Sequence, residues 1–403
     1  MSVNLVNIPA HVPRDRVRDV DLYNLPGADV DVQAAWQRVQ EQSPAVFFTP
    51  RYGGYWVIAR ADLLEQVWPD HERFSSIGAI GIPRIPGAPA QLPIESDPPV
   101  HQYFRTPINF SMAPRAVQLL SDRARGLMVA LIEKLRPRGE CEFVADVAAH
   151  VPMEVFLTIV DLPGDDREWL IERTQIMTRG GVASLKQQAL QEIFGYLGKW
   201  LDERTARPGN DLISRILQIK VGDRPITREE ALSECALVLF GGLDTVAGTM
   251  SFIARHLAEH PEHRRQLAAD PALIPKAIEE LLRRYSIPTV GRILTQDVTL
   301  DGVTLKAGDS VQLTTCFHAV DEKLWPDALS VHFDRRVTEH LMSFGKGAHK
   351  CPGSNLARAE LRMFVEEWLR RIPEFSVKPG DRAITATGAV AGVLRLPLVW
   401  PVS

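Results

Sequence analysis

Apolar residues recur at helical spacing along most of the chain. This amphipathic pattern predicts helices over residues 32–42, 114–136, 165–180, 184–206, 228–260, 272–285 and 354–371. Short runs rich in β-branched and aromatic residues predict a hairpin over 45–59, and strands over 293–305, 310–315 and 393–400. The β-type runs are too few and too scattered for a doubly wound sheet or a barrel. The expected fold class is therefore mainly α with small β-sheets.

The longest predicted helix, over residues 228–260, contains a polar break in an apolar run. Gly241 and Gly242 each cost a helix about 1 kcal/mol relative to alanine, and Asp244 and Thr245 follow them directly. One interpretation is that a ligand approaches the backbone there. The other is close helix–helix packing, with the Thr245 hydroxyl returned to the Gly241 carbonyl.

Composition and charge narrow the class of protein. The chain has 403 residues, of which 45% are hydrophobic and 24% charged, and its formal net charge is −4. These values predict one globular domain over residues 1–403 and give no reason to expect a nucleic-acid partner. The N-terminus has no apolar core of signal-peptide type, and no run of about 18 apolar residues follows. We therefore expect a cytoplasmic protein with no membrane partner.

The four cysteines point to one exceptional position. Cys141, Cys235, Cys316 and Cys351 are far apart and form no C-x-x-C pair, which argues against a zinc ribbon, an iron–sulfur cluster or a disulfide framework. Only Cys351 stands in a glycine-punctuated loop, "SFGKGAHKCPGSN". It needs an explanation of its own.

The residues around Cys351 favour a thiolate. Pro352 suits the first position of a helix, so we expect Cys351 at a helix N-terminus, where the dipole and free amides stabilise negative charge. Gly345, Gly347 and Gly353 allow amides to approach the sulfur without side chains in the way. A thiolate shielded in this way is better suited to holding a metal than to attacking a substrate.

The loop resembles a known signature. From Phe344 to Gly353 the sequence "FGKGAHKCPG" has the form F-x-x-G-x-x-x-C-x-G, and "EELLRR" and "FGGLDT" precede it. Together these three motifs resemble the haem-thiolate monooxygenases, the cytochrome P450 superfamily. Stretches such as "SDPPVHQYFR" and "GVLRLPLVW" resemble its bacterial camphor-hydroxylase branch. The resemblance implies a structural ion-pair cluster of Glu280 and Arg283, which we expect Arg336 to join.

The resemblance also implies a fold, a cofactor and partners. The fold would be a triangular helical prism in which the long helix crosses a buried b-type haem, with Cys351 as the axial ligand of the iron. Gly241 and Gly242 would open a groove in this helix, where Thr245 orients and Asp244 relays protons to dioxygen. Electrons would come from a ferredoxin with its ferredoxin reductase, and the substrate would be a small apolar molecule.

Haem propionates need cationic or donor partners. The positions that match the family are His101, Arg105, Arg292 and His349. Val290 departs from the camphor branch, which has an acid near a propionate at this position. One propionate is therefore expected to be bonded differently. Separately, we expect a basic proximal face for the electron donor, formed by Arg105 with Lys346, Lys350 and Arg358.

The predicted distal loop, over residues 77–96, suggests the substrate class. It contains no tyrosine or tryptophan, and Pro89 stands by count where the camphor branch has a tyrosine that holds the substrate ketone. A terpenoid or norisoprenoid bound mainly by burial is therefore expected, and camphor is expected to bind poorly. The candidate pocket residues are Ile80, Pro89, Leu237, Phe240, Pro288, Ala389 and Val390.

Three alternatives remain open at this point. A cysteine-nucleophile hydrolase could use His349 as its base, but it would leave the Gly-Gly-x-Asp-Thr helix unexplained. A haem-bearing sensor without turnover would keep Cys351 and have no need for Asp244 and Thr245. A peroxide-driven haem-thiolate enzyme is nearest, and the intact acid–threonine pair argues against it.

Overall fold

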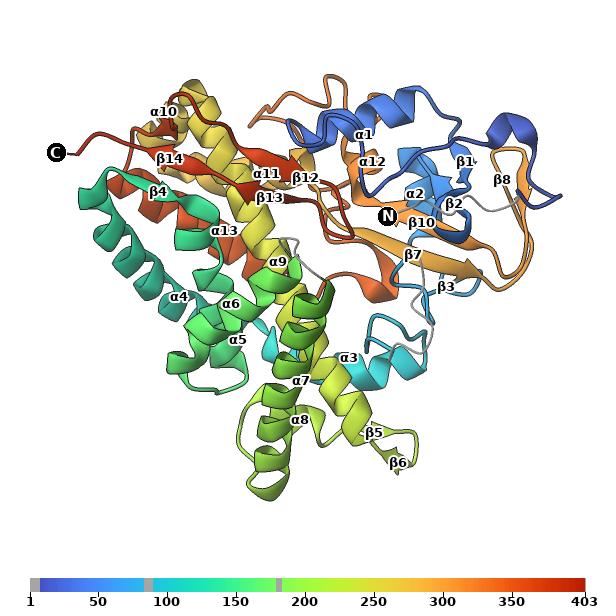
Figure 1. The fold of residues 1–403 in the computed structure, drawn as a ribbon, viewed down its shortest axis with the longest axis horizontal. Helices are drawn as coiled ribbons and strands as arrows, with labels where there is room; N and C mark the ends of the chain where they lie inside the picture. The colour runs from blue at the N-terminus through green and yellow to red at the C-terminus, as the bar shows by residue number, and fades with distance from the viewer. Residues whose placement is uncertain (1–7, 83–89, 179–182, 403) are drawn as a thin grey trace.

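One long helix crosses the molecule and divides it into two parts. The computed structural model describes residues 8–82, 90–178 and 183–402. Helix α9 (Arg228–Glu259) runs diagonally through the centre of Figure 1, with helices including α4, α5 and α7 on one side and the largest sheet on the other. This arrangement, mainly α with small β-sheets, confirms the expected fold class.

The other helices surround α9 and follow the amphipathic pattern closely. Seven helices, α9 among them, were predicted from the sequence, with ends that differ by at most two residues. The helices are α1 (Val32–Glu41), α2 (Ala61–Val67), α3 (Val100–Ser111), α4 (Pro114–Leu135), α5 (His150–Ile159), α6 (Arg167–Thr178), α7 (Ala183–Ala206), α8 (Leu212–Ile216), α10 (Pro261–Ala269), α11 (Ile274–Arg284), α12 (Thr315–Ala319) and α13 (Ser354–Arg371).

The sheets are small, and the largest lies beside the N-terminal helices. Its five strands have the order β1-β2-β10-β7-β3, and β1 and β2 form the predicted antiparallel hairpin. The strands are β1 (Val46–Thr49), β2 (Tyr55–Ile58), β3 (Phe74–Ser75), β4 (Glu140–Glu142), β5 (Lys220–Val221), β6 (Arg224–Pro225), β7 (Thr289–Leu294), β8 (Val298–Leu300), β9 (Val303–Leu305), β10 (Ser310–Thr314), β11 (Ser376–Val377), β12 (Ile384–Ala386), β13 (Gly392–Arg395) and β14 (Pro397–Val399).

Helix α9 is fixed at its start and buried along much of its length. A capping box joins Thr227 and Glu230, each side chain accepting a hydrogen bond from the other residue's amide. By length and composition α9 could also cross a membrane, which we did not expect from the sequence. Within its most apolar window, however, 56% is buried inside the protein, as in the core helix of a globular domain.

A buried arginine holds the segment that follows α12. Arg283 on α11 is 1% exposed and forms two 2.8 Å bonds with Glu280, one from Nε and one from Nη2. Its remaining donors reach the carbonyls of Ala319, Ala328 and Ser330 at 2.8–3.0 Å. These carbonyls belong to α12 and to irregular backbone, so one side chain ties this backbone to α11.

The third residue of this cluster is Arg335, and the prediction of Arg336 was wrong. Arg335 donates from Nε to Glu280 Oε1 at 3.2 Å and from its guanidinium to two backbone carbonyls. Adjacent residues outside a helix point in different directions, so only one of the two arginines can face Glu280. Among the described residues no ion pair joins Arg336 to Glu280, and both arginines line a neighbouring groove of about 510 Å³.

We predict that Arg283→Ala lowers the free energy of unfolding by about 3–5 kcal/mol, because it removes the two shortest bonds to the buried Glu280 carboxylate and frees three carbonyls. Urea unfolding followed by far-UV circular dichroism measures this. Arg362→Ala serves as the control, since Arg362 is half exposed and lies 3.9 Å from Glu366; its cost should stay below about 1 kcal/mol. Equal costs for the two variants would contradict the anchoring role of Arg283.

Candidate functional site

Cys351 lies near the end of a long irregular segment between α12 and α13. Two glycines shape this segment, because Gly345 and Gly347 have φ angles of +66° and +72°. A Cβ on Gly345 would lie 2.7 Å from the Trp68 ring nitrogen, and one on Gly347 would lie 2.7 Å from the Pro69 Cα. Only glycine combines these backbone angles with such close contact to the end of α2.

The helix after Cys351 begins where the periodicity predicted, but the expected place of Pro352 in it was wrong. The first helical residue is Ser354, with Gly353 at the N-cap, so Pro352 does not occupy the first helical position. A three-residue 3₁₀ turn, Gly347–His349, comes shortly before Cys351. The Cys351 amide then donates to the Phe344 carbonyl at 2.9 Å, which fixes the cysteine against the start of the motif.

The sulfur of Cys351 experiences opposing influences. Burial raises the pKa of the Cys351 thiol, whereas the Gly353 amide and the positive charges of Arg105 and Arg358 lower it. Burial is the largest of these effects. A metal cation at the sulfur would add the positive charge that a buried thiolate requires.

The predicted propionate partners come together near this loop. The rings of His101 and His349 lie 4.4 Å apart, and His349 Nε2 is 3.1 Å from the Ser76 hydroxyl. Burial and neighbouring positive charges lower the pKa of His101 to about 4, so this imidazole is neutral at pH 7. Asp97, which the sequence analysis missed, lies 3.9 Å from His349 and accepts a 3.0 Å bond from the Ser76 amide.

Two ring nitrogens of this cluster are buried without partners in the described chain, namely His101 Nε2 and His349 Nδ1. The Arg292 guanidinium, 3% exposed, donates to the adjacent Gly291 carbonyl at 2.7 Å but has no carboxylate within ion-pair distance among the described residues. Burial lowers the pKa of Arg292 to about 10, so it remains a cation at pH 7.

These groups fit the cofactor that the sequence resemblance implies. A buried cation and two orphaned imidazole nitrogens would be satisfied by an anion that enters between them. The carboxylates of haem propionates are such anions. Arg105 is half-buried nearby and donates to Asn109 at 2.9 Å and to the Lys350 carbonyl, one residue before Cys351.

The glycine pair on α9 faces open space. Gly241 and Gly242 are exposed, and a Cβ built on either would meet no atom within 4 Å. Close helix packing therefore does not explain these glycines. The predicted backbone bond of Thr245 is confirmed, because its hydroxyl donates to the Gly241 carbonyl at 2.8 Å. Asp244 is half-buried beside it.

Two segments that carry predicted pocket residues converge on α9. Pro288 pairs with Val390 in an isolated β-bridge, and the Thr289 amide donates to the Ala389 carbonyl at 2.9 Å. On α9, a Cβ at Gly248 would lie 3.6 Å from both the Ala391 carbonyl and the Ile287 side chain. The segments around 288 and 390 therefore pack against each other and against the long helix.

The remaining predicted pocket residues lie on the same side or outside the described chain. Leu237 and Phe240 are half-buried on α9 within four residues of Gly241. Ile80 is half-buried and follows Ala79, whose carbonyl would overlap a Cβ on Gly291. This contact brings Ile80 close to Arg292. Pro89 lies outside the described residues.

Two buried carboxyl groups were missed in the sequence analysis. Glu234 on α9 and Glu360 on α13 are at most 2% exposed, and burial raises their pKa values to about 9 and about 8. Both are therefore neutral acids at pH 7. Only the apolar residues around them signal this, since a single glutamate in a helix ordinarily faces solvent.

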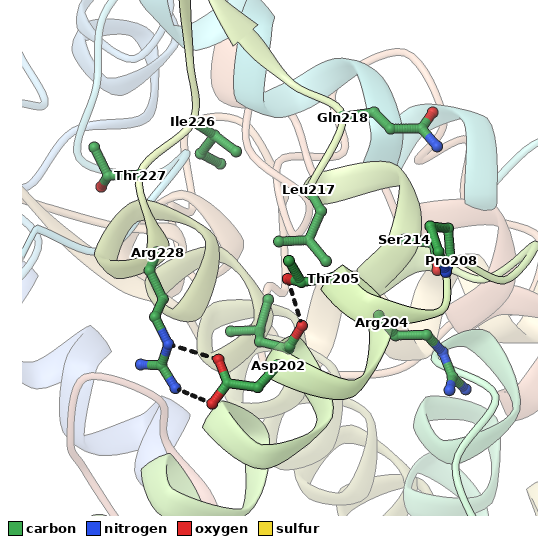
Figure 2. Close-up of a pocket in the computed structure, with 11 residues that line it drawn as sticks. Asp202, Arg204, Thr205, Pro208, Ser214, Leu217, Gln218, Ile226, Thr227 and Arg228 are labelled. Carbon is green, nitrogen blue, oxygen red and sulfur yellow. Dashed lines mark hydrogen bonds and ion pairs between the residues drawn. The ribbon is translucent and has the colours of Figure 1, made fainter.

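A second surface groove lies away from these residues. It measures about 430 Å³ and is bounded by α7, α8 and the start of α9. Figure 2 shows Asp202 and Arg228 facing each other at its edge, where they form two 2.9 Å bonds. The charges of Asp202 and Arg228 are thus paired with each other, and none of the predicted site residues lines the groove.

Comparisons with known proteins agree with this site. The cytochrome P450 family model matches residues 169–397. The chain is 32% identical to probable cytochrome P450 127A1 of Sinorhizobium fredii, with 98% of this chain and 97% of the relative covered. It is also 32% identical to the steroid C26-monooxygenase of Mycolicibacterium smegmatis, with 95% and 96% covered.

Solved structures agree as well. The crystal structure of cytochrome P450 CYP101C1 is 40% identical and covers 98% of this chain and 100% of that chain, with a TM-score of 0.89. This neighbour fits the resemblance to the bacterial camphor-hydroxylase branch. The chain belongs to the cytochrome P450 family, and it is a monooxygenase whose cofactor is a b-type haem with a thiolate ligand.

Proposed function

We propose that this chain hydroxylates a small apolar substrate of terpenoid or norisoprenoid type in the cytoplasm. It uses dioxygen and two electrons from a ferredoxin with its ferredoxin reductase. One observation carries the proposal: Cys351 shares its surroundings with buried donors that lack an anion in the described chain, while α9 presents an open glycine pair. A cysteine hydrolase would need neither feature.

The cofactor would be held from several elements. Cys351 would be the iron ligand, with the Gly353 amide directed at its sulfur. Arg292 on β7 would bind the propionates through its buried positive charge, and His101 on α3 and His349 through their unsatisfied ring nitrogens. Arg105 connects α3 to the Lys350 carbonyl and so would keep the cysteine loop against the same group.

The haem, when bound through a thiolate, supplies the activation of dioxygen that inserts one oxygen atom into a C–H bond. The chain's own residues would control access and protons. Gly241 and Gly242 leave space for the reacting molecules beside the helix. The Thr245 hydroxyl would orient a hydrogen bond toward this space, and Asp244 would relay protons from solvent.

The electron donor would dock beside Cys351 through basic residues. Lys350 is exposed and has no acidic partner within 4 Å among the described residues. Lys346 and Arg358 are instead paired with Glu65 and Glu279, which reduces their contribution. Lys350 is therefore the strongest candidate to steer an acidic ferredoxin, at a rate that falls as the salt concentration rises.

The substrate class follows from what the pocket offers. The candidate walls in the described residues are apolar: Ile80, Leu237, Phe240, Pro288, Ala389 and Val390. The stretch over 77–96 has no tyrosine or tryptophan to donate a hydrogen bond. Binding would depend mainly on buried apolar area, at about 25 cal/mol per Å², and a substrate carbonyl would gain little.

The first prediction tests Cys351 as the iron ligand. The reduced wild-type protein under carbon monoxide should show the red-shifted Soret band of thiolate ligation, and Cys351→Ser should lose that band. Cys316→Ser is the control, because the Cys316 thiol is buried and bonded to the Ser286 carbonyl at 3.1 Å. Persistence of the shifted band in Cys351→Ser would refute the assignment.

The second prediction concerns Thr245. Thr245→Ala should keep haem and the substrate-induced spin shift, but product formed per electron should fall severalfold as peroxide rises, since the orienting hydroxyl is lost. Thr249→Ala is a matched control, because Thr249 makes the same 2.8 Å bond one turn later, to the Thr245 carbonyl. Ferredoxin-supported turnover with product and peroxide assays measures the coupling. Unchanged coupling in Thr245→Ala would contradict its role.

The third prediction tests whether the pocket holds a substrate carbonyl group. Without a donor in the pocket, camphor should bind no more tightly than its parent hydrocarbon, and about tenfold more weakly than an ionone. Haem spin-state titrations measure all three affinities. Clear preference for camphor over its hydrocarbon would show that a donor holds the ketone, and this account of the pocket would then be wrong.

A further inference from the structure

A cluster of histidines lies where α9 ends and α10 begins. His260 caps both helices and is followed by Pro261, Glu262 and His263 in the first turn of α10. His256 lies one turn earlier on α9, with its ring stacked on that of His260 at 4.3 Å between centroids. The monooxygenase function uses none of these side chains.

Three side chains of the cluster present metal-binding atoms to one another. One ligand atom each from His260, Glu262 and His263 lies within 4.8 Å of the other two. His260 Nδ1 and Glu262 Oε1 are already 3.0 Å apart. The side chains of His260 and Glu262 are 45% and 62% exposed, so both can reorient without breaking the core.

A buried partner already orients His263. His263 Nδ1 lies 2.9 Å from His256 Nε2, and His256 Nδ1 lies 2.9 Å from the Tyr285 hydroxyl. The 2.9 Å contact places the His256 ring nitrogen where it can accept the His263 N–H. A metal-ligating histidine typically donates its second ring nitrogen to a fixed acceptor of this kind.

The surroundings do not oppose a cation strongly. Arg255 is paired with Glu259 at 2.9 Å, and the exposed His332 is paired with Asp327 at 3.2 Å. The ring of Phe333 packs on His263 at 4.8 Å between centroids, which leaves one face of the imidazole covered. Glu262, the most exposed member of the cluster, supplies negative charge.

We propose that His260, Glu262 and His263 form a binding site for a divalent transition-metal ion of the Zn²⁺ or Cu²⁺ class. Two imidazoles and one carboxylate suit these ions and do not suit Ca²⁺ or Mg²⁺, which prefer oxygen ligands. Water would complete a four-coordinate shell. Metal–ligand bonds of about 2.0–2.1 Å require ligand atoms about 3.4 Å apart, so the side chains must close modestly from their present positions.

This site is separate from the haem site, and an ion bound there would act on the stability of the fold. Nineteen residues of helix separate His260 from Gly241, about 28 Å along the axis of α9. A bound ion would join the end of α9 to α10 and, through His256 and Tyr285, to α11. Because such an ion binds the folded protein preferentially, it would raise the temperature of unfolding.

The test uses the haem-loaded protein without a histidine tag. Titration calorimetry with Zn²⁺ should show one site, and the electron paramagnetic resonance spectrum of added Cu²⁺ should show coupling to imidazole nitrogen. His260→Asn should weaken Zn²⁺ binding more than tenfold, and Glu262→Gln severalfold. The matched control is His332→Asn, which removes a nearby exposed histidine outside the cluster and should bind Zn²⁺ like the wild type.

Two results would overturn the proposal. One is a wild-type dissociation constant for Zn²⁺ weaker than about 1 mM, the range of nonspecific surface binding. The other is equal affinity in the wild type and His260→Asn. The carbon monoxide spectrum of each variant should match the wild type, so a change in metal binding is distinguishable from loss of the haem site.

Discussion

The segment that leads to Cys351 is anchored by the buried pair of Arg283 and Glu280. Between α12 and α13 the chain has only one short 3₁₀ turn, so its backbone polar groups cannot satisfy one another as they would in a helix. Arg283 binds three carbonyls of α12 and this region, and Glu280 accepts the His332 amide and Arg335. This buried ion pair therefore fixes backbone that has no regular secondary structure of its own.

The cofactor site that we propose lies where this irregular segment meets α3 and β7. Helix α3 brings His101, strand β7 brings Arg292, and the loop itself brings His349. One ring nitrogen of each histidine is left unsatisfied by the described chain, a cost that a folded protein carries where a bound group will satisfy it. In the proposed site the opposing wall would be α9, whose glycine pair leaves its backbone open. A bound haem would therefore satisfy polar groups that the fold leaves without partners.

The sequence predicted elements whose patterns are local and missed those set by tertiary contacts. Helix α5 was missed because it is apolar on nearly every face and so has no helical period, and α3 was hidden by Pro107 in its interior. The motif residues were identified by resemblance. The choice of Arg335 over Arg336 depends on the path of irregular backbone, which no periodicity records.

The two buried acids give this protein an unusual proton balance. Glu234 and Glu360 have pKa values raised far above those of an unfolded chain, so the folded state retains protons that the unfolded state has released. Between about pH 4.5 and pH 8–9, these groups make folding less favourable as pH rises. Surface ion pairs such as that of Asp381 with Arg395 have the opposite effect in acid. Unfolding at neutral pH would therefore release protons from the core while the surface pairs simply separate.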